Sequence, residues 1–197
     1  MSEILILYYS RYGSVANLAR RIADGVEEVD GMSARLRTVP ALRSVADASP
    51  AQSVPNEGPP YVSIDDLKSC SGLICGSPTR FGNMAAPMKA FWDSTGGAWM
   101  SGALAGKPGA VFTSTSSLHG GHESTLLSMI TPLMHHGMLI VGIPFTEPAL
   151  ARTDSGGAPY GAGHIARKQD DTALSDDEKT LARALGRRVA DIAKKLG

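Results

Sequence analysis

Apolar residues form short runs along the chain, and most runs are followed by a stretch with apolar residues at every third or fourth position. The first run, EILILYY, is typical of a buried strand. The runs SGLICG, PGAVFTS and GMLIVGI predict three more buried strands, and SARLRTV predicts a more exposed one. Helical spacing follows the first run at Val15, Leu18, Ala19, Ile22 and Val26.

Polar residues mark the beginning of two helices. Ser63 with Asp66 and Ser175 with Glu178 have capping-box spacing, in which each residue bonds the backbone of the other. The second box precedes an apolar stripe that predicts a C-terminal helix: Leu181, Leu185, Val189, Ile192 and Leu196. A further helix face is predicted from Met84, Met88, Phe91 and Trp92.

Strands that alternate with helices favour a parallel sheet covered on both sides. We therefore expect an α/β fold, a doubly wound five-stranded parallel sheet with helices on both faces. The length of 197 residues fits a single domain over 1–197. Two stretches without clear periodicity, at about 40–60 and 147–170, are expected to be insertions, and the second is long enough to serve function or oligomer formation.

The charge balance is neutral, with 19 Lys plus Arg against 19 Asp plus Glu, so we expect no nucleic-acid partner. The segment MSEILILYYS lacks the basic start and cleavage site of a signal peptide, and no stretch is long and apolar enough for membrane insertion. The two cysteines, Cys70 and Cys75, fit small core residues in a reducing compartment. We expect a cytoplasmic protein.

Candidate chemistry lies at the carboxyl ends of the strands, where loops of a parallel sheet meet. The loop SRYGSV joins a strand to a helix N-terminus, where free amides favour an anion and Ser10 and Ser14 add hydroxyl groups. It has neither the lysine of a Walker motif nor the glycines of a dinucleotide fold, which favours a terminal monophosphate. A plain helix cap is the alternative.

The loops SPTRFGNM and STSSLHGG contain no carboxylate and many small residues, which suits a planar heterocycle with carbonyl and imide edges. A flavin fits that description. Thr79 and the amides of Arg80, Phe81 and Gly82 could meet the polar edge of the ring, and Gly82 allows a close approach.

Two other patterns are not assigned a function. GAGHIA satisfies a dinucleotide pattern formally, but no strand is predicted before it. The histidines at 119, 122, 135 and 136 lack zinc-site spacing, so we expect no metal.

Five motifs in order, LYYSRYG, GSPTRFGNM, DSTGGAWMSGALAGK, HHGMLIVGI and GGAPYGA, together resemble the WrbA family. These are FMN-dependent type IV NAD(P)H:quinone oxidoreductases of flavodoxin-like fold. The resemblance covers nearly the whole chain. It implies FMN as cofactor, NADH or NADPH as co-substrate, and two-electron reduction of quinones to hydroquinones by a ping-pong hydride mechanism.

The resemblance also implies a set of site residues and a homotetramer whose active sites are shared between subunits. The FMN site would comprise Ser10, Arg11, Tyr12, Gly13, Ser14, Val15, Pro78, Thr79, Arg80, Phe81, Gly82, Ser114, Thr115, Ser116, Ser117, Leu118, His119, Gly120 and His135. Nicotinamide or quinone would lie against Trp99, Tyr12 and Phe81. No residue is assigned as a catalytic acid, base or nucleophile.

Two other functions are weighed against this one, a flavodoxin-like one-electron carrier and a flavin-dependent regulatory binding protein. One-electron carriers of this fold are typically strongly acidic, which disfavours the anionic reduced flavin. This chain is neutral, which favours the enzyme.

Overall fold

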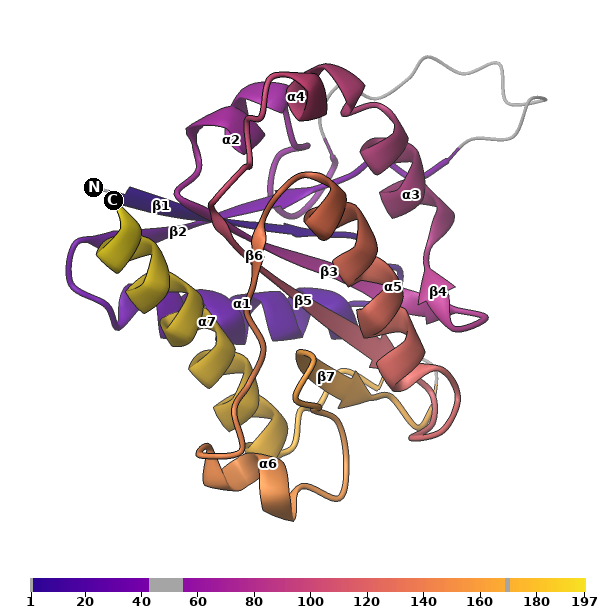
Figure 1. Cartoon of the computed structure of the whole chain (residues 1–197). Coiled ribbons are helices and arrows are strands. Elements are labelled where there is room, and N and C mark those ends of the chain that lie inside the picture. Colours follow the sequence, from indigo (N-terminus) through magenta and orange to yellow (C-terminus); the bar gives the residue numbers. More distant parts are fainter. Residues whose placement is uncertain (1, 43–54, 169–170) are drawn as a thin grey trace.

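The structure, a computed structural model, describes residues 2–42, 55–168 and 171–197 (Figure 1). Much of the expected insertion at 40–60 lies outside these ranges. The strands are β1 (Ser2–Tyr8), β2 (Met32–Thr38), β3 (Gly72–Arg80), β4 (Asn83–Met84), β5 (Pro108–Thr115), β6 (Leu139–Ile140) and β7 (Ala162–Ile165). The helices are α1 (Ser14–Glu27), α2 (Ile64–Ser69), α3 (Ala86–Asp93), α4 (Gly96–Met100), α5 (His122–His135), α6 (Pro148–Arg152) and α7 (Asp176–Leu196).

The strands form one twisted sheet in the order β2-β1-β3-β5-β6, with parallel pairing along this path. The strand β7 also pairs with β5 in parallel, beyond β6, and the short β4 pairs antiparallel with β3. The predicted doubly wound α/β sheet is confirmed.

The sequence predicts one continuous strand in GMLIVGI, but the structure has two short strands at this edge of the sheet. The strands β6 and β7 pair with successive parts of β5, and the chain between them leaves the sheet and returns. Val141 N–H still donates to the Gly109 carbonyl at 2.8 Å, but Gly142 lies directly against the returning chain. A Cβ at Gly142 would stand 2.1 Å from the Pro159 carbonyl oxygen. The segment 147–170 therefore includes α6 and β7.

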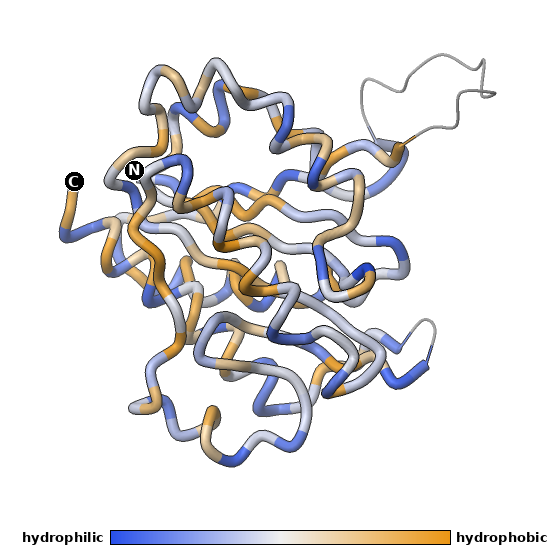
Figure 2. Tube along the Cα trace, turned by 45° about the vertical axis from the view of Figure 1, so that its right-hand side comes forward, coloured by the Kyte–Doolittle hydropathy of each residue, from blue (hydrophilic) through white to orange (hydrophobic). Residues whose placement is uncertain are grey.

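Helices cover both faces of the sheet, with α1 and α7 side by side on one face and α3 and α5 on the other (Figure 1). Alternate residues of β1 serve the two layers: Ile4 and Ile6 pack with α1 and α7, whereas Leu5 and Leu7 pack towards α5. Burial on both faces explains why these strands read as continuous apolar runs. Figure 2 shows hydrophilic residues concentrated on the outer loops and helix surfaces.

Both capping boxes form as predicted, at Ser63 with Asp66 and at Ser175 with Glu178. Met84 was expected on a helix but lies in β4, because the chain turns back on β3 before α3 begins at Ala86. Cys70 and Cys75 are buried free thiols, as expected of core residues. Within the described ranges, no helix is long and apolar enough to cross a membrane.

Candidate functional site

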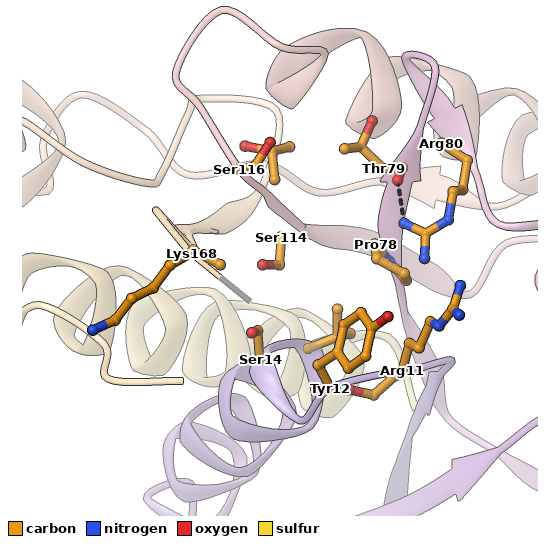
Figure 3. A pocket seen from close by; sticks show the side chains of 13 residues that line it. Arg11, Tyr12, Ser14, Pro78, Thr79, Arg80, Ser114, Ser116 and Lys168 are labelled. Carbon is orange, nitrogen blue, oxygen red and sulfur yellow. Dashed lines mark hydrogen bonds between the residues drawn. The ribbon is translucent and has the colours of Figure 1, made fainter. Parts of the chain in front are cut away.

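The loops after β1, β3 and β5 meet the segment after β7 at the carboxyl ends of the strands. They enclose a cavity of about 310 Å³, which we call the loop pocket (Figure 3). It is lined by Ser10, Arg11, Tyr12, Ser14, Val15, Pro78, Thr79, Arg80, Ser114, Thr115, Ser116, Ala166 and Lys168. Most of these residues were named as site residues from the sequence, and the structure brings them together at one edge of the sheet.

The first loop forms an anion site at the start of α1. Gly13 has a left-handed backbone, with φ of 96°, and turns the loop into the helix. The Ser10 Oγ accepts from the amides of Gly13 and Ala16, at 3.2 and 3.3 Å. Within the described ranges, five backbone amides of this loop donate to no group: those of Ser10, Arg11, Tyr12, Ser14 and Val15. Free amides and the helix dipole together favour a phosphate.

The two serines of this loop have different roles. Ser14 Oγ donates to the carbonyl of Asp171 at 2.9 Å, so its proton is already used. Ser10 Oγ only accepts, so its own proton is free to donate to a ligand. Asn17 Nδ2 donates to the carbonyl of Thr172 at 2.9 Å and fixes the same neighbouring segment against α1.

The second loop is held in place by the start of α5. Thr125 Oγ1 donates to Thr79 Oγ1 at 2.8 Å, which leaves the Thr79 proton free to donate into the pocket. Gly121, with φ of 97°, precedes α5, and a Cβ there would lie 2.8 Å from the Gly82 Cα. Glycine at 121 therefore allows the two loops to approach closely.

The loop pocket is electropositive. Arg11, Arg80 and Lys168 line it, and none of the lining residues found in the described chain is a carboxylate. Lys168 and Ala166 were not predicted as site residues, because the segment that holds them follows β7 and was assigned to an insertion. The sequence feature that could have indicated them is the run Gly161 to Ala166. This run contains β7, and the carboxyl end of β7 lies beside that of β5.

The sequence matches the model of the family described as NADPH-dependent FMN reductase over residues 4–146. The chain belongs to this family. A protein from Chromohalobacter salexigens named NAD(P)H dehydrogenase (quinone) is 47% identical, with 100% of this chain and 99% of the relative covered. A protein of the same name from Gluconacetobacter diazotrophicus is 46% identical, with 100% and 99% covered. These relatives confirm the resemblance seen in the motifs.

Solved structures confirm the flavodoxin-like fold of this FMN reductase family member. A flavodoxin, WrbA-like protein from Agrobacterium tumefaciens has a TM-score of 0.69 at 22% identity, with 100% of both chains covered. A flavodoxin from the domain Archaea has a TM-score of 0.63 at 20% identity, with 98% of this chain and 99% of that one covered.

Several predicted site residues lie outside the loop pocket. Gly13, Phe81, Gly82, Ser117, Leu118, His119 and Gly120 belong to its loops but do not line it. The Phe81 ring is fully exposed, and its backbone is left-handed with φ of 53°, a costly conformation for a residue with a Cβ. A strained, exposed aromatic beside a pocket is suited to a ligand or a second subunit.

Trp99 and His135 lie at a separate cavity of about 650 Å³ between α3, α4 and α5, which we call the helix pocket. Trp99 Nε1 donates to the carbonyl of His135 at 2.8 Å, and this hydrogen bond holds the indole ring against the end of α5. His136, beside them, is buried, and burial lowers the pKa of its imidazole. Within one subunit these residues are not brought to the loop pocket.

Proposed function

We propose that the chain is an FMN-dependent NAD(P)H:quinone oxidoreductase that reduces quinones by two electrons. The observation that carries this proposal is the loop pocket itself, with free amides at the start of α1 and no carboxylate among its lining residues in the described chain. A phosphate fits the free amides of the first loop and the Ser10 hydroxyl. The Thr79 hydroxyl suits a carbonyl edge of the ring.

When bound, FMN would accept hydride from the nicotinamide and pass it to the quinone, and that chemistry belongs to the cofactor. The protein would position the ligands and supply charge. Arg11, Arg80 and Lys168 favour negative charge in the loop pocket, and this stabilises the fully reduced, anionic state. One substrate would leave before the other enters the same space, which gives ping-pong kinetics.

The electron carrier and the regulatory protein are less well supported. A one-electron carrier needs an environment that opposes the second negative charge, and cations line this pocket instead. The chain also lacks the net negative charge that would steer an acidic carrier to basic partners, since 19 Lys plus Arg balance 19 Asp plus Glu.

We further propose a homotetramer with shared active sites. Trp99 is 50% exposed at the helix pocket, and Phe81 projects fully from its loop. A neighbouring subunit could bring such residues against the flavin, where an aromatic wall would hold the nicotinamide or quinone. The free thiols and the soluble redox cofactors fit a cytoplasmic location.

The test is to purify the protein, identify its flavin, and measure benzoquinone reduction with NADH and NADPH. We expect bound FMN and parallel lines in double-reciprocal plots at varied quinone, the pattern of ping-pong kinetics. Sedimentation should give the mass of a tetramer. A protein that binds no FMN under any condition would end the proposal.

A further inference from the structure

Arg11 and Arg80 lie between the loop pocket and a second cavity. This cavity has a volume of about 720 Å³, and we call it the outer hollow. Both arginines line both cavities. Most residues that line the outer hollow are apolar, and several of these are small, such as Ala86, Pro87 and Ala90.

Neither guanidinium has a carboxylate partner within 2–42, 55–168 and 171–197. Arg80 Nη1 donates to the carbonyl of Thr79 at 2.6 Å, and the Arg11 guanidinium lies 5.2 Å from the centre of the Tyr12 ring. Figure 3 shows the two arginine side chains reaching towards each other. Two guanidinium groups that line the same cavities, without a carboxylate partner in the described residues, favour an anion that both can bind.

The phosphate of the flavin does not explain this pair. The free amides of the first loop already provide a phosphate site at the start of α1, beside Ser14. Figure 3 shows Ser14 and Lys168 on one side of the loop pocket and both arginines on the other. An anion bound by the two arginines would therefore belong to a second ligand.

We propose that Arg11 and Arg80 bind the diphosphate of the nicotinamide dinucleotide, with its adenosine in the outer hollow. This inference rests on the proposed function and adds a binding site for one substrate. Quinones are mostly uncharged, whereas both nicotinamide dinucleotides carry a diphosphate. Guanidinium groups suit it because they donate paired hydrogen bonds to phosphate oxygens.

The same geometry bears on the choice between NADH and NADPH. Lys89 is the further cation that lines the outer hollow, and it already pairs with Asp93 at 2.5 Å. With Arg11 and Arg80 assigned to the diphosphate, the additional 2′-phosphate of NADPH meets no further free cation among the described lining residues. The two cofactors should therefore bind with affinities that differ by less than about tenfold.

The test uses the FMN-loaded protein and the variants R11Q, R80Q and R11Q/R80Q. ADP-ribose carries the diphosphate without redox chemistry, and its binding is measured by calorimetry. Each substitution should weaken it about tenfold, because each removes hydrogen bonds to a charged group. The KM for NADH should rise in parallel, while the KM for reduced nicotinamide mononucleotide, which lacks the diphosphate, changes less than about threefold.

Two controls separate this site from other effects. R21Q removes an exposed arginine that pairs with Asp24 on α1, away from both cavities, and should bind ADP-ribose as the wild type does. R11K keeps the charge and should recover part of the affinity. Unchanged ADP-ribose affinity in the double variant would overturn the inference, and so would loss of FMN with no separate effect on ADP-ribose. If wild-type protein binds no FMN, the proposed function fails instead.

Discussion

His164 and Glu178 form a buried pair, with His164 Nδ1 at 2.8 Å from Glu178 Oε2. The other ring nitrogen, Nε2, lies 3.0 Å from the carbonyl oxygen of Asp171. A carboxylate and a carbonyl can only accept, so both ring nitrogens must donate. His164 is therefore an imidazolium held inside the protein.

Glu178 joins this pair to the loop after α6 and to β7. Its carboxylate also accepts from Ser155 Oγ at 2.7 Å, the Gly156 amide at 2.9 Å and the Ile165 amide at 3.0 Å. Because Asp171 accepts from both His164 and Ser14, the network extends from α7 to the phosphate loop. The pair thus fixes the segment that closes one side of the loop pocket.

The pH dependence of stability should show this pair. Burial alone would lower the pKa of His164, but Glu178 and the Asp171 carbonyl outweigh burial and raise the pKa above its usual 6.5. The contribution of His164 to stability is therefore complete below pH 6.5 and is lost as pH rises through the raised pKa.

Glu178 sets the lower limit of this pH range. Burial would raise the pKa of Glu178, but hydrogen bonds from His164 and other donors lower it from 4.5 to about 2. Stability should peak between pH 4.5 and 6.5.

The variant H164Q removes the charge that compensates Glu178. Urea unfolding near pH 6 should show a loss of about 3–5 kcal/mol, typical of breaking one partner of a buried pair. The decline of stability above pH 6.5 should also become shallower. H119Q removes an exposed histidine and should change neither quantity. Equal pH slopes for H164Q and wild type would contradict the assignment of the imidazolium.

This network also shows what sequence can and cannot predict. The capping box at Ser175 and Glu178 was predictable because its hydrogen bonds depend on local spacing. The bonds from Glu178 to β7 were not, because they need the divided last strand to bring His164 beside α7. Lys168 was missed for the same reason. The loops 10–15 and 78–82 were found because the carboxyl ends of parallel strands always meet at one edge.

The two serines of the phosphate loop should contribute unequally to FMN binding. The sequence suggests that both hydroxyls hold the phosphate, but Ser14 donates to Asp171 and only Ser10 has a free proton. S10A should weaken FMN binding by about 1.5–3 kcal/mol, the free energy of a hydrogen bond to a charged group. S14A should weaken it less, because it only loosens the Asp171 segment. Fluorescence titration of the apoprotein measures both, and a larger loss for S14A would reverse this ranking.

Gly121 should be required for the close approach of α5 to the second loop. G121A introduces a Cβ that meets the Gly82 Cα at 2.8 Å, in addition to the strain of a positive φ. G31A provides the matched control, since Gly31 has φ of 84° but nothing within 4 Å of an added Cβ. We expect G31A to cost about 1 kcal/mol of stability and G121A at least twice that. Only G121A should weaken FMN binding. Equal FMN affinities in the two variants would show that the close approach of Gly121 to Gly82 does not matter for the cofactor site.

Trp99 should act on substrate binding rather than on flavin retention. W99A should keep FMN, since Trp99 lies at the helix pocket and not at the loop pocket of its own subunit. The KM for quinone should rise about 3–10-fold, the effect of losing one aromatic contact. W99F keeps an aromatic ring but loses the bond from Nε1 to the His135 carbonyl, and should stay near the wild-type KM. Loss of flavin from W99A at unchanged KM would place the residue at the cofactor instead.

Reduction of the bound flavin should proceed in one two-electron step. Reduced flavin gains negative charge, and an acidic surrounding would oppose the second electron. The loop pocket has cations at Arg11, Arg80 and Lys168, and no lining residue identified in the described chain is acidic. The second electron is therefore favoured along with the first.

An anaerobic dithionite titration should convert the oxidised spectrum directly to the reduced one through fixed isosbestic points. S116D adds a carboxylate at an exposed lining position, and should disfavour the second electron by on the order of 2 kcal/mol at an effective dielectric of about 20. An intermediate spectrum should then appear at half reduction, whereas the neutral S116N should behave as the wild type does. A large intermediate band at half reduction in the wild type would mean that the pocket favours one-electron over two-electron reduction of the flavin. The proposal of a one-electron carrier would then take the place of the proposal of a quinone reductase.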